Sequence, residues 1–139
     1  WGEMDVAAAA TFDTISAAGV CMFGMFVFPV EYTYELIEAV TGFPFDRQIA
    51  LETGQRIFTM RHAFNLREGI KRSDFVTSPR LLGKPPLPSG PTEGVSLDNE
   101  GYANAFFEAM DWDKKSLYPS KARLEDLGGL EAVIKTLYP

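Results

Sequence analysis

Cysteine and histidine, residue types often used as nucleophiles and metal ligands, each occur once in this sequence. Cys21 lies in an uncharged run from Thr14 to Val30, and His62 lies much further along the chain. His62 has no second histidine or carboxylate at metal-ligand spacing, which favours a hydrogen-bonded or surface histidine over a ligand or base. A thiolate can attack or bind a metal, whereas a cysteine between apolar neighbours is typical of an inert core residue. The residues alone leave both roles of Cys21 open.

Other kinds of catalytic or binding site have no local support. The glycines form no phosphate-binding loop of the P-loop or dinucleotide type. The 19 acidic residues offer carboxylates throughout the chain, so no pair stands out as an acid–base dyad. With 13 basic residues they give a net charge of -6 and an isoelectric point near 4.8, which argues against a nucleic-acid partner. We therefore assign no catalytic residue within this chain.

The size of the chain predicts one domain, covering residues 1–139, because 46% of its residues are hydrophobic and can form one core. The uncharged run is shorter than the about 20 apolar residues of a membrane span, and Gly19, Gly24 and Pro29 interrupt it, so we expect no membrane insertion. A single cysteine cannot form an internal disulfide, which makes the cytoplasm the expected location. The start at Trp1 suggests a piece of a longer protein.

The first part of the chain holds two expected helices and the uncharged run. Four successive alanines, Ala7 to Ala10, predict a helix over residues 1–12. From Thr14 onward, small residues predict a loop that closely approaches a ligand. Residues 22–28 are apolar on every side and are expected to be buried all round. A short helix over residues 32–40 should follow, with Gly42 as its stop.

The clearest amphipathic helix is expected to begin after Asp46 as N-cap and to end at Gly69. Its apolar face should carry Ile49, Ile57, Met60 and Phe64. Its arginines, at positions 47, 56, 61 and 67, should lie on a solvated face with exchangeable ion pairs.

The rest of the chain combines an irregular segment with short helices. Prolines and glycines concentrate in residues 73–97, which predicts an extended connection draped over a larger surface. The expected helices run from Asp98 to about Met110, from Ser120 to Gly128-Gly129, and through the last apolar residues to Leu137. No segment alternates with a period of two. The predicted fold is all-α, an irregular multi-helix domain with a long Pro/Gly-rich connection.

Several collinear stretches resemble the C-terminal part of the aldehyde ferredoxin oxidoreductase family. Residues 54–72, GQRIFTMRHAFNLREGIKR, look like a G-E-R-I stretch leading into F-N-x-R-E-G. Pro79-Arg80 is similar to a P-x-R corner, and residues 110–130, MDWDKKSLYPSKARLEDLGGL, resemble R-G-W-D, P-T and L-x-x-L-G-L. SAAGVC, residues 16–21, takes the place of D-x-x-G-L-C.

The resemblance implies the C-terminal part of an enzyme that oxidises small aldehydes to carboxylates and passes electrons through a [4Fe-4S] cluster to ferredoxin. It makes Cys21 the fourth cluster ligand and places Ser16, Gly19 and Val20 beside a pterin. The other three cysteines, in a C-x-x-C-x-x-x-C run, and most contacts to tungstopterin or molybdopterin would come from the N-terminal part of the same enzyme. The fragment alone should be inactive, without cofactor, and carry Cys21 as a free thiol.

Departures from the family pattern keep a second hypothesis open. Ser16 replaces an aspartate, for which Asp13, one helical turn earlier, is the candidate substitute. Gln55 replaces the glutamate of G-E-R, and Met110-Asp111 replaces R-G before the tryptophan. The alternative is a non-catalytic helical interaction module that kept the fold and lost the cofactor site. In that module Cys21 would be a core residue.

Overall fold

The computed structural model describes the whole chain, residues 1–139, and it is helical throughout its regular parts. The only β pairing consists of isolated bridges between Leu87 and Glu93 and between Trp112 and Pro119. This confirms the all-α prediction. The helices are α1 (Gly2–Ala17), α2 (Glu31–Thr41), α3 (Arg47–Arg67), α4 (Asn99–Ala109), α5 (Lys121–Leu127) and α6 (Glu131–Leu137), with short 3-10 helices η1 (Met22–Val27) and η2 (Arg72–Asp74).

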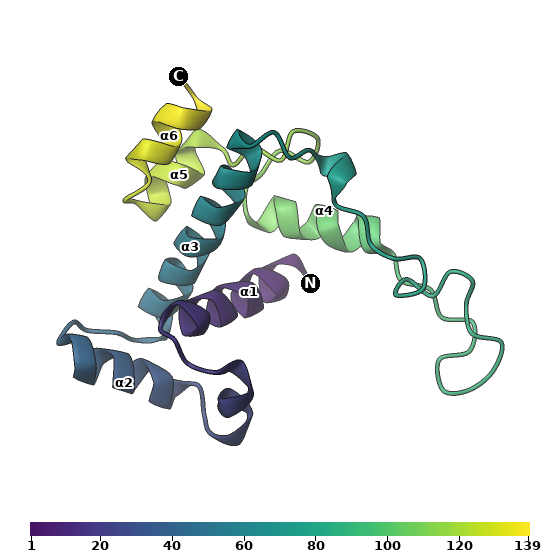
Figure 1. Cartoon of the computed structure of the whole chain (residues 1–139), viewed down its shortest axis with the longest axis horizontal. Helices are drawn as coiled ribbons and strands as arrows, with labels where there is room; N and C mark the ends of the chain where they lie inside the picture. The colour runs from purple at the N-terminus through teal and green to yellow at the C-terminus, as the bar shows by residue number, and fades with distance from the viewer.

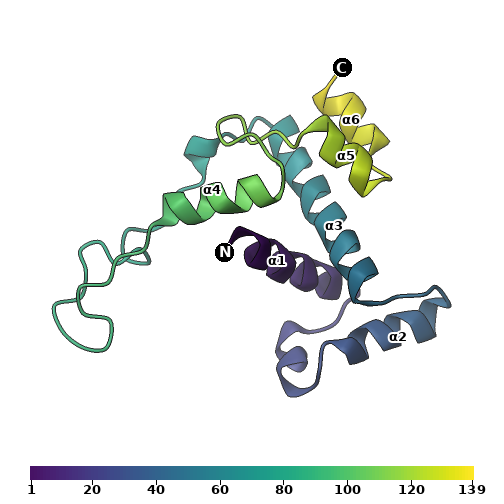
Figure 2. The same cartoon turned by 180° about the vertical axis from the view of Figure 1, so that it is seen from behind.

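Helix α3 is the centre of the arrangement, with α1 packed across it and α4 beside α1 (Figure 1). Helices α5 and α6 pack on the C-terminal half of α3, and η1 and α2 lie near its start (Figures 1 and 2). The caps expected for α3 and α5 are confirmed. Asp46 Oδ1 accepts a hydrogen bond from Ile49 N at 2.8 Å, and Ser120 Oγ accepts one from Arg123 N at 3.0 Å.

The first helix is longer than expected. It continues to Ala17, so the loop expected from Thr14 begins only after the helix ends. The physical reason is contact with α3: the buried Thr14 hydroxyl donates to Ala50 O at 2.7 Å. This hydrogen bond and the packing of the neighbouring Ile15 hold the last turns of α1 in place.

The buried face of α3 differs from the expected one. Met60 and Phe64 are exposed, although they were expected to face the core. The side of α3 that meets its neighbours carries mainly small and polar residues, because α1 approaches too closely for large side chains. The buried residues of α3 are Ala50, Gly54, Thr59, His62, Ala63 and Leu66.

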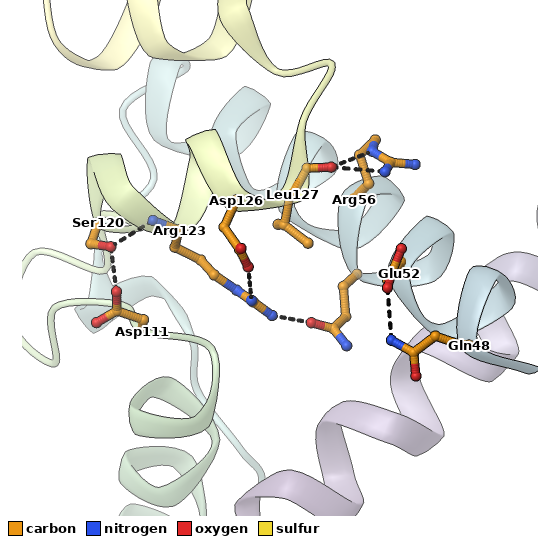
Figure 3. Close-up of polar contacts among 9 residues, drawn as sticks. Gln48, Glu52, Arg56, Asp111, Ser120, Arg123, Asp126 and Leu127 are labelled. Carbon is orange, nitrogen blue, oxygen red and sulfur yellow. Dashed lines mark hydrogen bonds and ion pairs between the residues drawn. The ribbon is translucent and has the colours of Figure 1, made fainter.

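The largest buried apolar cluster joins α3 to the C-terminal helices, and it includes Leu124, Leu127 and Leu137. Arg56 was expected on a solvated face, but it is half-buried and binds the end of α5 (Figure 3). Its Nε donates to Leu127 O and Gly128 O, both at 2.9 Å, and Nη2 donates to Leu127 O at 2.7 Å. The last carbonyl groups of a helix have no hydrogen-bond partner within the helix and carry a partial negative charge. They therefore bind a cation such as the Arg56 guanidinium.

Residues 73–97 form the irregular connection that their composition predicts, apart from the end of η2. The segment extends away from the helices in both views (Figures 1 and 2). No part of this chain provides the larger surface over which it was expected to lie. No helix has both the length and the apolar character that crossing a membrane requires.

Candidate functional site

Cys21 lies directly after the turn that ends α1. Gly19 N donates to Ser16 O, and Val20 N donates to Ile15 O, both at 3.1 Å. Gly19 has φ +76, a left-handed conformation that glycine adopts without steric cost, and this reverses the chain direction. Cys21 then has an extended backbone with φ -67 and ψ 125 as the N-cap of η1. The turn therefore fixes where the Cys21 side chain leaves the backbone.

The thiol of Cys21 is free and exposed. The hypothesis that it fills the core of this chain is therefore wrong. No group of three or more His, Cys, Asp or Glu side chains in the chain could hold a metal ion. Within this chain Cys21 therefore has no set of partner ligands with which to hold a metal ion.

Most of the apolar residues after Cys21 are also exposed, and the others are half-buried, which corrects the expectation that residues 22–28 are buried all round. Phe23 is 74% exposed and Val27 is 82% exposed. The reason is that the helices of this chain cover η1 only in part, through a small contact with α1. Exposed apolar side chains continue along α2 and just beyond it. We call the whole set the apolar segment: Met22, Phe23, Phe26, Val27, Tyr32, Leu36, Val40 and Phe43.

The residues expected beside a pterin lie around the same turn. The Ser16 side chain is exposed and makes no hydrogen bond within the chain. The N–H groups of Gly19 and Val20 are used to end α1, so the turn has no free donor at these two positions. Asp13 is only 15% exposed, and its Oδ1 accepts from Arg61 Nη1 at 2.6 Å. Ser16 is the most available of the four.

His62 belongs to a different part of the fold. Its side chain is buried, and Nε2 lies 2.9 Å from Leu117 O, which confirms the predicted hydrogen-bonded histidine. The ring lies flat on the Trp112 indole, with centroids 4.0 Å apart. Burial lowers the pKa of His62 below its ordinary value of 6.5, and the bond to Leu117 only partly opposes this. The structure does not bring His62 and Cys21 together as a catalytic pair.

Sequence reasoning missed the surroundings of His62. Two stretches that carry the family resemblance, residues 54–72 and 110–130, meet where His62 contacts Trp112. Phe58 lies one helical turn before His62 and also stacks on Trp112. The spacing of Phe58 and His62 was a usable signal, but nothing in the sequence showed that Trp112 reaches them.

Comparison with known proteins first identifies the class of protein to which this chain belongs. The sequence model of the family described as "Aldehyde ferredoxin oxidoreductase, domains 2 & 3" matches residues 3–128. The chain therefore belongs to the aldehyde ferredoxin oxidoreductase family.

Particular relatives are proteins named tungsten-containing aldehyde ferredoxin oxidoreductase. The Pyrococcus furiosus protein is 28% identical over 114 residues, which is 82% of this chain and 19% of that relative. The proteins of Pyrococcus abyssi and Thermococcus kodakarensis are 27% and 26% identical with the same coverage. The chain thus spans about a fifth of the length of the curated relatives that it matches. No solved structure gives a significant match.

Proposed function

We propose that residues 1–139 form one domain, the C-terminal helical region of a tungsten-dependent oxidoreductase that converts aldehydes to carboxylates. Electrons would pass through a [4Fe-4S] cluster to ferredoxin, in the cytoplasm. Family membership supports the oxidoreductase class. The observation that carries the part played by this chain is the exposed, free thiol of Cys21 directly after the Gly19 turn.

Cys21 would supply one of the four thiolates that a [4Fe-4S] cluster needs. The geometry fits this role because the thiol is accessible and the turn holds its backbone in one conformation. The single cysteine of the chain also means that the remaining three ligands must come from elsewhere. On this proposal the intact protein is an enzyme, and this chain alone is inactive and binds no cofactor.

Contact with the pterin is proposed for Ser16, with Gly19 and Val20 beside it. The free, exposed hydroxyl of Ser16 supports a hydrogen bond to a polar edge of the pterin. Gly19 and Val20 could offer only carbonyl oxygens, because their N–H groups are already bonded. Asp13 would contribute only if Arg61 released its carboxylate. Tungstopterin, or molybdopterin in its place, would supply the two-electron oxidation chemistry when bound.

The apolar segment would contact the N-terminal part of the same enzyme. Its side chains are exposed within this chain, and water contact with so much apolar surface is unfavourable. Phe23 and Phe26 lie in η1, immediately after Cys21. Covering them would exclude water from the cluster side of Cys21, which is one way in which a protein controls the potential of a metal centre.

The test is Cys21→Ala in the full-length protein that carries this chain. We expect the variant to lose iron and the visible absorption of the cluster, together with aldehyde oxidation. Ser16→Ala serves as the matched control, because it lies in the same turn but is not a cluster ligand. It should keep the cluster spectrum and lower the tungsten and pterin content.

Two results would contradict the proposal. One is a Cys21→Ala protein with unchanged iron content and spectrum. The other is a wild-type full-length protein that contains neither iron nor tungsten or molybdenum, which would support the non-catalytic helical module instead.

A further inference from the structure

A cavity of about 330 Å³ lies between the second half of α3, η2 and α4. Its walls include His62 and Phe58 of α3, Ala103 of α4, and Trp112 from the segment after α4. Cys21 and the apolar segment take no part in it. The volume is within the usual range for a small-molecule site.

The walls of the cavity are rich in flat aromatic groups. Trp112 stacks against His62 with an angle of 11° between the planes, and against Phe58 at 5.6 Å and 16°. Phe106 meets Trp112 edge to face at 6.1 Å. Because aromatic rings pack well in stacked and edge-to-face arrangements, these walls favour a planar aromatic ligand.

One hydrogen-bond acceptor is available in this apolar setting. Leu117 O can only accept, so the hydrogen bond from His62 places the ring proton on Nε2. Nδ1 of the neutral ring then carries a lone pair, and it has no partner within the chain. Nδ1 is not fully buried, so an atom from outside the ring can reach it. Burial lowers the pKa of His62, which keeps the ring neutral near neutral pH.

The other unpaired polar atom of the wall is closed off from the cavity. The indole Nε1 of Trp112 makes no hydrogen bond, but it is fully buried, so a ligand cannot reach it. The polar contact to a ligand therefore depends on His62. A hydroxyl group is the simplest uncharged ligand group that donates to a ring nitrogen.

The only guanidinium in the cavity wall is already paired. Arg72 donates to Glu100 and to Asn104, and it lies over the Phe107 ring at 5.0 Å from the centroid. Glu100 thus neutralises the charge of Arg72. Arg72 itself occupies the face of the Phe107 ring on which another cation could bind. An additional charged ligand would find no free partner here, so the site favours an uncharged molecule.

We propose that this cavity binds a small uncharged aromatic molecule that carries a hydroxyl group, of the phenol or aryl-alcohol class. The aromatic walls hold the ring, and the free nitrogen of His62 accepts from the hydroxyl. The proposal does not depend on the role of Cys21, because the two sites share no residue.

The test uses the full-length protein and measures phenol binding by calorimetry and ligand-observed NMR. Anisole, which has the same ring but no hydroxyl donor, is the paired probe. We expect a phenol dissociation constant of about 1 mM or tighter, as suits so small a ligand. Anisole should bind at least about threefold more weakly, since it cannot donate to His62.

Two variants locate the site. Ala103→Met fills the cavity from α4 and should weaken phenol binding at least about tenfold. Ala8→Met is the matched control, because it makes the same change at an exposed position of α1 and should leave binding unchanged. His62→Phe keeps the flat ring that stacks on Trp112 and removes both ring nitrogens, including the acceptor. It should weaken phenol about three- to tenfold and leave anisole unchanged.

The proposal is overturned if wild-type protein does not bind phenol, or if Ala103→Met binds it as well as Ala8→Met does. Equal binding of phenol and anisole to the wild type would overturn the hydroxyl part. If His62→Phe fails to fold, the probe comparison and the Ala103 variant still decide the question.

Discussion

A Cβ atom placed on Gly54 would lie 1.9 Å from the carbonyl oxygen of Ala10. Helices α3 and α1 therefore touch backbone to backbone at this point, with no room for any side chain on Gly54. The same kind of contact joins α1 to α4, where a Cβ on Gly2 would lie 2.1 Å from Ala105 O. These contacts bring the end of α1, and with it the Cys21 turn, to a defined place on α3.

Gly54→Ala should destabilise the protein by about 3 kcal/mol, at the upper end of the usual cost of overpacking, because the obstacle is backbone and cannot move aside. Thermal and denaturant unfolding of the full-length protein measure this effect. Glu52→Ala, an exposed change on the same helix, is the control and should alter stability by less than about 0.5 kcal/mol. A Gly54→Ala protein as stable as the wild type would show that α1 and α3 are further apart.

Two buried threonines should respond in opposite ways to replacement by valine. Thr14→Val removes the bond to Ala50 O and should cost about 1 kcal/mol. Thr59 is fully buried and its hydroxyl has no partner, so Thr59→Val should be neutral or stabilising. Chemical denaturation of the two variants side by side gives the comparison. Equal losses would mean that the Thr59 hydroxyl is satisfied.

Arg56→Ala should lower stability by about 1.5–3 kcal/mol, because the carbonyls of Leu127 and Gly128 lose a charged donor at the end of α5. Arg47→Ala is the matched control, since Arg47 is an exposed arginine of the same helix without an ion pair. Hydrogen exchange should show faster opening of α5 in the Arg56 variant alone. Unchanged exchange there would contradict the role assigned to Arg56.

The stability of the protein should depend on the titration of His62. Its pKa is lowered by burial, so below about pH 6.5 the unfolded chain binds the proton more readily than the folded one. The contribution of the neutral His62 ring to the free energy of unfolding is complete above that pH. It is lost as the pH falls toward the pKa that His62 has in the folded protein. The nearest charged groups across the cavity, Arg72 and Glu100, pair with each other.

His62→Gln should therefore make the free energy of unfolding less dependent on pH between about pH 7 and pH 5. The difference in slope between the two proteins can reach about 1.4 kcal/mol per pH unit. Denaturant unfolding at a series of pH values measures it. Parallel curves for wild type and variant would show that His62 titrates normally.

Local signals in the sequence predicted the helix boundaries well. Asp46 and Ser120 begin their helices by accepting bonds from backbone N–H groups three residues later. Gly42 and Gly69 follow helix ends with positive φ, which few other residues adopt easily. These interactions join residues close in sequence, so the residue types are enough to predict them.

The faces of the helices were predicted less well. Met60 and Phe64 were expected inside and are exposed, whereas Gly54 and the half-buried Arg56 were not expected to matter for packing. Apolar residues that recur with the helical period indicate an apolar face and a polar face. The neighbouring helices decide which face is buried. Here α1 approaches so closely that small residues occupy the contact.

The sequence by itself determined that the chain is helical, where most helices begin and end, and which family its motifs resemble. Only the tertiary structure showed that Cys21 is exposed and that His62, Phe58 and Trp112 surround a cavity. The physical reason is the range of the interactions. Caps and turns join near neighbours in the chain, whereas exposure and cavities depend on helices that meet from distant parts of it.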